Sequence, residues 1–115
     1  MKNLIFILSL QFCLLVCFNC EKPEIELTSM TKSFIEDTEI DLYCRALKGT
    51  SLKYRWMLDG NELKTDDDFD ISNKKVSSIL TIKNSNTKHS GKYSCIATNK
   101  FGESIADLVV NIEGC

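Results

Sequence analysis

Side chains that carry enzyme chemistry are scarce in this chain of 115 residues. General acid–base and nucleophilic catalysis need histidine, cysteine or paired carboxylates that converge in a pocket. The one histidine, His89, precedes a predicted strand at a surface corner, where we expect a solvated residue rather than a pH switch. The cysteines are better used in disulfides. We therefore predict that the protein is not an enzyme and has no catalytic residues and no cofactor.

Acidic side chains cluster in residues 65–70, Thr-Asp-Asp-Asp-Phe-Asp, and supply the oxygen ligands that calcium prefers. The segment lacks the fixed spacing and the glycine of a calcium-binding loop. Runs of like charge are more often solvated connections between structural elements. We predict no metal site here, and an exported calcium-binding module is kept only as an alternative.

Lysines in expected turns and at outward strand positions are candidates for a strip that binds a glycosaminoglycan, against the simpler reading of ordinary solvated lysines. These residues are Lys74, Lys75, Lys83, Lys88, Lys92 and Lys100. The chain as a whole has 14 Lys+Arg and 16 Asp+Glu, a formal net charge of −2. So small a charge of mixed sign gives no general attraction to anionic membranes, and we predict no nucleic-acid partner.

The N-terminus starts with a basic residue, Lys2, and continues with an apolar run from Leu4 to Phe18. This pattern is typical of a secretory signal peptide, and the run is shorter than the roughly 20 residues that span a bilayer. We predict a signal peptide over residues 1–20, cleaved between 17 and 20, and a secreted domain over residues 21–115 without a membrane span. The 6 cysteines agree with export, because disulfides persist in oxidising compartments.

The remainder of the chain consists of short segments in which apolar and polar residues alternate with period 2, as in β-strands. The alternation places these side chains on inward faces: Ile40, Leu42, Cys44 and Ala46; Tyr54, Trp56 and Leu58; Tyr93, Cys95 and Ala97; Ala106, Leu108, Val110 and Ile112. Asp59-Gly60 is a strong hairpin signal because both residue types tolerate positive φ. About eight such strands predict an all-β fold, a two-sheet antiparallel sandwich.

Three motifs in the second half of the chain resemble one branch of a known sandwich family. Leu80-Thr81-Ile82 is similar to a Leu-x-Ile strand, Gly91-Lys92-Tyr93-Ser94-Cys95 to an Asp-x-Gly-x-Tyr-x-Cys corner, and the segment from Ala97 to Gly102 to a Cys-x-Ala-x-Asn-x-x-Gly hairpin. With Trp56-Met57-Leu58-Asp59-Gly60, they resemble the I-set (C2-like) branch of the immunoglobulin superfamily.

The resemblance implies an immunoglobulin-like sandwich with one core disulfide, Cys44–Cys95. The core signature would consist of Trp56, Tyr93, Leu80 and Gly91. In this family the tryptophan packs against the bridge, and the tyrosine hydroxyl ties down the corner before the second cysteine.

Two residues depart from the family pattern. His89 stands where the corner motif has aspartate, so we expect the family's ion pair to a basic residue across the sheet to be absent. Ser85 stands where an apolar residue normally fills the bottom of the core. Both departures predict a slightly less stable domain.

Outward residues on the sheet that carries Trp56 form the predicted partner face. The residues are Arg55, Met57, Ile96 and Thr98, with Lys92 and Ser94 beside them. We expect Met57 and Ile96 to be exposed there as a small apolar patch, on a face that this superfamily often uses for partners. The alternative is that they are isolated exposed apolar residues, which are common.

The terminal residue, Cys115, has no partner in the core bridge. A bond to Cys20 is not expected, because the ends of such a sandwich lie far apart and a disulfide needs Cα atoms within about 7 Å. The alternatives are an intermolecular bridge in a homodimer, a free thiol, or a natural chain that continues past this residue.

The family resemblance implies a secreted, extracellular binding module that recognises another protein, as a receptor, ligand or adhesion molecule. The main alternative is the N-terminal immunoglobulin segment of a longer receptor, adhesion molecule or neuregulin-like growth factor. A third hypothesis is an exported module that binds heparan sulfate or calcium.

Overall fold

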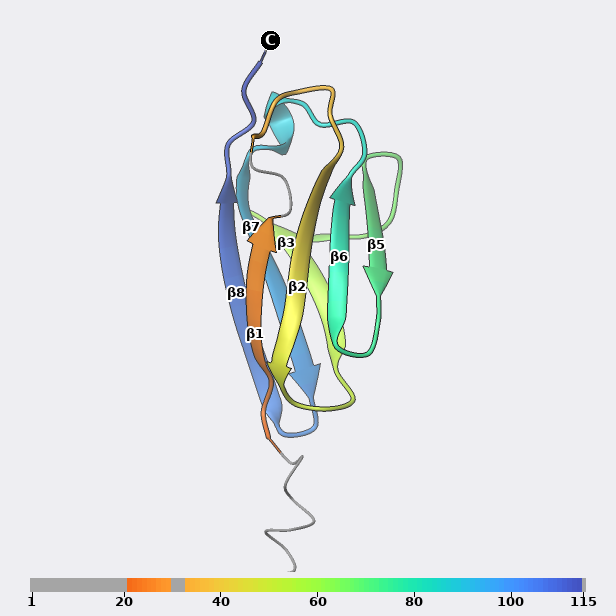
Figure 1. Cartoon of the computed structure of the whole chain (residues 1–115), viewed down its shortest axis with the longest axis vertical. Coiled ribbons are helices and arrows are strands. Elements are labelled where there is room, and N and C mark those ends of the chain that lie inside the picture. Colours follow the sequence, from red (N-terminus) through yellow and green to blue (C-terminus); the bar gives the residue numbers. More distant parts are fainter. Residues whose placement is uncertain (1–20, 30–32, 115) are drawn as a thin grey trace, which may run out of the picture.

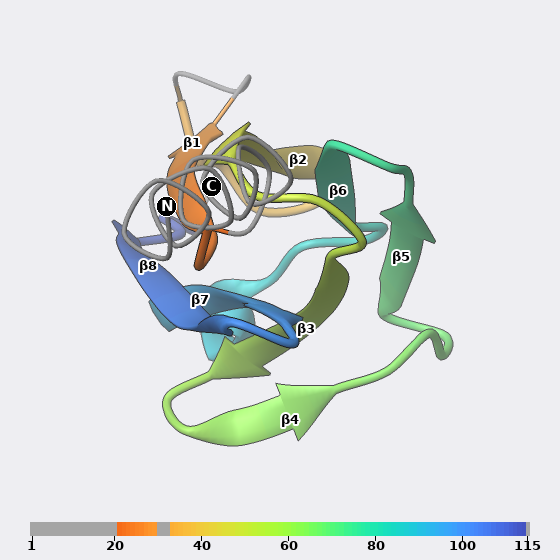
Figure 2. The ribbon, with the colours of Figure 1, turned by 90° about the horizontal axis from the view of Figure 1, so that it is seen from below.

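The computed structural model describes residues 21–29 and 33–114, and in these residues eight strands form two four-stranded antiparallel sheets that face each other (Figures 1 and 2). The first sheet has the order β1 (Glu24–Ser29), β2 (Ile40–Lys48), β6 (Ser77–Ile82) and β5 (Phe69–Asn73). The second has the order β4 (Asn61–Leu63), β3 (Lys53–Leu58), β7 (Gly91–Asn99) and β8 (Gly102–Val110). The prediction of an all-β, two-sheet antiparallel sandwich is confirmed.

The core lies between the sheets and is built from the inward side of the period-2 alternation. Fully buried side chains come from both sheets: Ile40, Leu42, Leu80 and Ile82 from the first, and Trp56, Tyr93 and Ala97 from the second. Burying a large apolar side chain contributes roughly 1.5–3 kcal/mol each. A few strands of this length can therefore hold a small sandwich together.

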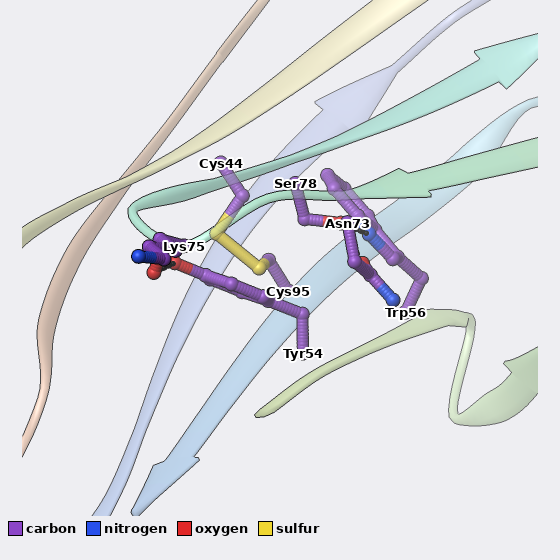
Figure 3. Close-up of a disulfide and its surroundings, with 7 residues drawn as sticks. All are labelled: Cys44, Tyr54, Trp56, Asn73, Lys75, Ser78 and Cys95. Atoms are coloured by element: carbon purple, nitrogen blue, oxygen red, sulfur yellow. Dashed lines mark hydrogen bonds between the residues drawn. A yellow bond between two sulfur atoms is a disulfide. The ribbon is translucent and has the colours of Figure 1, made fainter. Parts of the chain in front are cut away.

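A disulfide between Cys44 of β2 and Cys95 of β7 joins the two sheets through the core (Figure 3), with 6.4 Å between the Cα atoms. Beside it, the indole Nε1 of Trp56 donates to Ser78 Oγ at 2.8 Å, and that hydroxyl donates to Asn73 Oδ1 at 2.6 Å. The chain of hydrogen bonds satisfies a buried donor that would otherwise carry a desolvation cost of about 1–3 kcal/mol.

The corner before β7 contains a short 3₁₀ helix, η2 (Thr87–His89), and the Tyr93 hydroxyl donates to the His89 carbonyl at 2.5 Å. Burial, and to a lesser extent the nearby Asp59 carboxylate, raise the pKa of Tyr93 far above its usual range. Tyr93 therefore stays protonated and keeps its hydrogen bond at any physiological pH.

The expectation of a solvated His89 is wrong, because only 6% of the residue is exposed. Its ring packs edge-on against Phe69 with 5.2 Å between centroids, and its Nδ1 accepts the Asn86 backbone N–H at 3.1 Å. Its Nε2 lies 3.8 Å from Asp68 Oδ2. At this corner, therefore, the histidine ring faces a carboxylate from the β4–β5 connection.

Ser85 is fully buried and is used as a polar clamp instead of an apolar filler. Its hydroxyl donates to the Ile35 carbonyl at 3.1 Å and accepts the Thr38 N–H at 3.3 Å. Among the described residues no buried side-chain nitrogen or oxygen lacks a hydrogen-bond partner. Each such bond contributes about 0.5–1.5 kcal/mol, which offsets the loss of apolar packing that the sequence predicts at this position.

The Asp59-Gly60 hairpin forms between β3 and β4 as predicted, with φ of 49° and 85°. The Asp59 carboxylate crosses to β7 and accepts the Lys92 N–H at 2.8 Å. A Cβ atom on Gly91, whose φ is 153°, would lie 2.5 Å from Asp59 Oδ2. Glycine is thus required at this position by both the backbone conformation and the close approach of the carboxylate.

The chain enters β1 at one end of the sandwich and leaves β8 at the other (Figure 1). The predicted signal peptide, residues 1–20, and the cysteines Cys20 and Cys115 lie outside the described residues. No helix in the described ranges has the length and apolar content needed to cross a membrane.

Candidate interaction surface

The four residues predicted to form a partner face do lie on one side of the second sheet. The register pairs Arg55 with Ile96, Met57 with Ser94, and Lys53 with Thr98 on the neighbouring strands β3 and β7. Their exposure differs from the prediction. Ile96 is only 4% exposed and Met57 is half-buried, so the expected apolar patch around these two residues is wrong.

A polar network crosses β7 beside Ile96, because the register pairs Arg55 with Ile96 and Glu103 with Thr98. Arg55 of β3 reaches Glu103 of β8 with 3.3 Å between Nη2 and Oε2, although β7 lies between those strands. Thr98 of β7 donates its hydroxyl to the same carboxylate oxygen at 3.3 Å. The guanidinium also approaches Glu62 Oε1 of β4 at 3.7 Å. These partly exposed ion pairs contribute about 0–1 kcal/mol each to stability. They place charged side chains on the part of the sheet where an apolar patch was expected.

Exposed apolar side chains lie instead on β8, the edge strand of the same sheet. Ile105 is 59% exposed and Val109 is 71% exposed. They alternate with Glu103 and Asp107 on the outward side of the strand. We call these four residues the β8 face. An edge strand has a neighbour on one side only, so its outward side chains are covered on one flank and open on the other.

The β8 face was not identified from the sequence, although a signal for it was present. The last strand was predicted from its inward residues, which include Ala106 and Leu108. The period-2 alternation then requires Ile105 and Val109 to point outward. Two apolar residues at outward positions of one strand were the sign of an exposed patch.

The acidic segment before β5 does not converge on a metal site. Asp66 Oδ1 accepts the N–H groups of Asp68 at 2.8 Å and Phe69 at 2.9 Å, and these bonds lower the pKa of Asp66. The carboxylate is thus occupied in shaping the turn. Within residues 21–29 and 33–114, no three histidine, cysteine or acidic residues are close enough together to hold a metal ion.

The lysines of the predicted glycosaminoglycan strip do not lie together. Lys74 and Lys75 are in the β5–β6 turn and Lys100 is in the β7–β8 turn, at the lower end in Figure 1. Lys83 and Lys88 lie in the β6–β7 connection at the opposite end. These lysines therefore do not form one continuous strip, although Lys74, Lys75 and Lys100 share one end of the sandwich.

Two open clefts of similar size indent the described surface. One, of about 390 Å³, lies between the edge strands β4 and β5 and includes Lys64, Thr65 and Ile71 in its lining. The other, of about 400 Å³, lies between the β2–β3 turn and the β5–β6 turn, with Ser51, Lys75 and Val76 in its lining. Neither lining contains a histidine or a cysteine.

The fold, the bridge and the tyrosine corner agree with a match to a protein family. A family model described as "Immunoglobulin domain" matches residues 22–99. The chain belongs to the immunoglobulin domain family. Its assignment to the I-set branch is a finer statement that rests on the motifs alone.

Curated relatives share sequence with this chain, and a solved structure shares its fold. The chain is 34% identical to the chicken "BDNF/NT-3 growth factors receptor" over 95 residues, covering 80% of this chain and 11% of that protein. It is 31% identical to "Muscle M-line assembly protein unc-89" of Caenorhabditis elegans over 103 residues, covering 81% of this chain and 1% of that protein. The immunoglobulin domain Ig7 of Dscam1 (isoform 5) superposes with a TM-score of 0.73 at 21% identity, over 80% of this chain and 97% of the Dscam1 domain.

The chain spans only about 1% to 21% of the lengths of the curated relatives that it matches. These matches therefore describe one domain of each relative. The immunoglobulin relatives support a protein-interaction module as the general class.

Proposed function

We propose that the protein is a secreted, non-catalytic immunoglobulin domain that binds another extracellular protein through the β8 face. The observation that carries this proposal is the exposure of Ile105 and Val109 on an otherwise charged surface. Apolar side chains flanked by charges are typical of the centre of a protein–protein interface, where they are buried by the partner while the polar rim gives specificity.

The core disulfide supports an extracellular location. Cys44 and Cys95 are fully buried and bonded in the folded domain. Structural disulfides persist in oxidising compartments and are rare in the cytosol. One relative is named for the muscle M-line and another as a growth-factor receptor, so family membership alone does not fix the location. The bridge and the predicted signal peptide together favour export.

The side chains that could carry acid–base or nucleophilic chemistry have structural uses in the described residues. The histidine is used as a cap and packs against Phe69, and the bonded cysteines are not nucleophiles. The receptor relative is named for protein growth factors, which is consistent with a protein ligand as the class of partner.

A longer natural protein is the main alternative. The small share of each relative that the chain covers favours a domain that belongs to a larger receptor, adhesion molecule or growth factor. Sequencing transcripts past the codon for Cys115 separates the two. A reading frame that continues into a second domain supports the longer protein. A stop codon together with a disulfide-linked dimer on non-reducing gels supports a single domain that pairs through Cys115.

The binding test uses the secreted chain as a multivalent probe against an array of purified receptor and adhesion-molecule ectodomains. We expect at least one ectodomain to bind, and Val109→Asp to reduce that binding at least tenfold. Leu47→Asp is the matched control, because Leu47 is 46% exposed on β2 of the opposite sheet. Equal loss in both variants, or no loss in either, contradicts the assignment of the β8 face.

A further inference from the structure

The net charge of −2 hides an uneven distribution of charge between the two ends of the sandwich. We define the basal end by four segments that meet there: the residues before β1, the β2–β3 turn, the β5–β6 turn and the β7–β8 turn (lower end in Figure 1). The basal end carries Lys22, Lys48, Lys53, Lys74, Lys75 and Lys100. Its carboxylates are Glu21, Glu24 and Glu103. Glu24 is 3.7 Å from the Lys48 ammonium, and Glu103 is 3.3 Å from the Arg55 guanidinium.

The opposite end has an excess of acidic residues. Its connections carry Glu36, Asp37, Glu39, Asp59, Asp66, Asp67, Asp68 and Glu113. The same connections carry fewer lysines among the described residues, namely Lys64, Lys83 and Lys88. Opposite charges at the two ends produce a field that points a polyanion toward the basal end and repels it from the other. The net charge of the sequence does not show this separation of charge, because it sums both ends.

The turns that carry the basal lysines are tied to one another and to the core. The Asn99 side-chain amide donates to the Glu21 carbonyl at 2.8 Å and to the Thr50 carbonyl at 3.3 Å, which joins three of the four segments. The β5–β6 turn is anchored by the Ala46 N–H, which donates to the Val76 carbonyl at 2.8 Å. The lysines therefore extend from a fixed frame, which lowers the entropy cost of binding an extended ligand.

The cleft of about 400 Å³ lies within this basic end. Its lining combines the hydroxyl-bearing residues Thr50 and Ser51, the Lys75 side chain, and the apolar Leu52 and Val76. Sugar rings present both hydroxyl groups and apolar ring faces, so a lining of this kind matches a saccharide. Lys74 precedes Lys75 in the same turn, and Lys53 follows Leu52 at the start of β3.

We propose that the basal end binds a sulfated polysaccharide, with one sugar unit in the cleft and sulfate groups on Lys74, Lys75 and Lys53. Lysines spread over several turns suit an extended polyanion better than a single small anion. Two apolar residues are also exposed at this end: Val76 is 61% exposed, and Phe101, whose ring centre lies 5.1 Å from the Lys100 ammonium, is 40% exposed. Binding to a lipid surface is therefore one of the outcomes that the test distinguishes. The inference rests on the proposed function only for the extracellular location.

The test measures the binding of the secreted chain to immobilised heparin and to a heparin oligosaccharide in solution near 0.15 M salt. The double variant Lys74→Gln/Lys75→Gln should bind about tenfold more weakly, since two contacting charges are removed. The control Lys83→Gln/Lys88→Gln makes the same change in net charge at the acidic end and should leave the affinity within about twofold. Wild-type binding should also weaken steeply with salt.

Three results would overturn the proposal. The first is no heparin binding by the wild type, and the second is an equal loss in the two double variants, which would indicate a response to net charge alone. The third is tighter binding to phosphatidylserine vesicles than to heparin, lost in Phe101→Ser, which would indicate a membrane surface. Val109→Asp should retain full heparin binding, so failure of this site is distinguishable from failure of the β8 face.

Discussion

The neighbouring strands β7 and β8 both alternate between inward and outward side chains, but the outward side chains in the middle of β7 are buried whereas those on β8 are exposed. Ile96 on β7 and Ile105 on β8 are paired in the register and both point outward, yet 4% of one and 59% of the other is exposed. β7 has a neighbouring strand on both sides, and β8 has one strand beside it in its sheet. The comparison teaches that alternation determines which way a side chain points, whereas position in the sheet determines whether it is covered.

The inward-facing residues of the two strands also differ in their roles. Cys95 and Tyr93 of β7 form the disulfide and the corner hydrogen bond, while the register places Ala106 and Leu108 opposite them on β8. β7 thus holds the domain together and β8 displays a surface. The predictions below test this division, beginning with the largest expected effect.

Removing the bridge of β7 should have the largest effect on stability. In Cys44→Ala/Cys95→Ala the free energy of unfolding should fall by about 2–5 kcal/mol, because the cross-link no longer restricts the unfolded chain. Urea unfolding followed by tryptophan fluorescence measures the change. Ala106→Ser, on β8 opposite Cys95, should change stability by less than about 1 kcal/mol. If removal of the bridge lowered the free energy of unfolding no more than Ala106→Ser does, the stabilising role of β7 would be contradicted.

The two outward isoleucines provide the most direct comparison of β7 with β8. Ile96→Ala should cost about 2–4 kcal/mol, because the side chain is covered by its neighbours. Ile105→Ala should cost less than about 0.5 kcal/mol, since most of the side chain is already in water. Equal losses of unfolding free energy would show that the two faces are alike.

The corner hydrogen bond of β7 should make stability depend on alkaline pH. The pKa of Tyr93 is raised in the folded state, so the unfolded tyrosine ionises first as pH rises. The stabilisation is fully present below the unfolded pKa of about 10 and is lost as pH increases above it.

Tyr93→Phe should lower the free energy of unfolding by about 1–2 kcal/mol near neutral pH, because the His89 carbonyl loses its donor. Above pH 10 the variant should show a shallower loss of stability than the wild type. Chemical denaturation at several pH values measures both effects. Parallel pH curves would mean that another group causes the alkaline loss; Tyr54, whose pKa burial also raises, is the first candidate.

The network over β7 should have the smallest effect. Arg55→Ala and Glu103→Ala should each change stability by about 0–1 kcal/mol, with a coupling energy in the double-mutant cycle that declines at high salt. The informative readout is oxidation of Ile96 by hydroxyl radicals, which should rise in Arg55→Ala. No rise would mean that the network does not cover the isoleucine.

Much of the fold could be predicted from the sequence because it depends on local alternation and on a few spaced residues. The inward faces of β2, β3, β7 and β8, the Asp59-Gly60 hairpin and the Cys44–Cys95 bridge are as expected. These features follow from period-2 burial and from turn chemistry, which adjacent residues determine.

The parts that could not be predicted depend on residues far apart in the chain. Arg55 and Glu103 form an ion pair across β7 beside the buried Ile96, and the buried His89 packs against Phe69. Ser85 is satisfied by backbone groups of a distant turn at Ile35 and Thr38. Burial at these positions is a property of the assembled sheets, so a pattern of neighbouring residues does not contain it.

The central claim, that the partner surface lies on β8 rather than β7 and β3, is tested most directly by two matched variants. Val109→Asp introduces a carboxylate into the β8 face, and Met57→Asp introduces one into the face first predicted. Melting temperatures establish that both variants fold. The account predicts that Val109→Asp loses at least tenfold in affinity for the ectodomain that the wild type binds, while Met57→Asp stays within about threefold. The reverse order of affinities would contradict it.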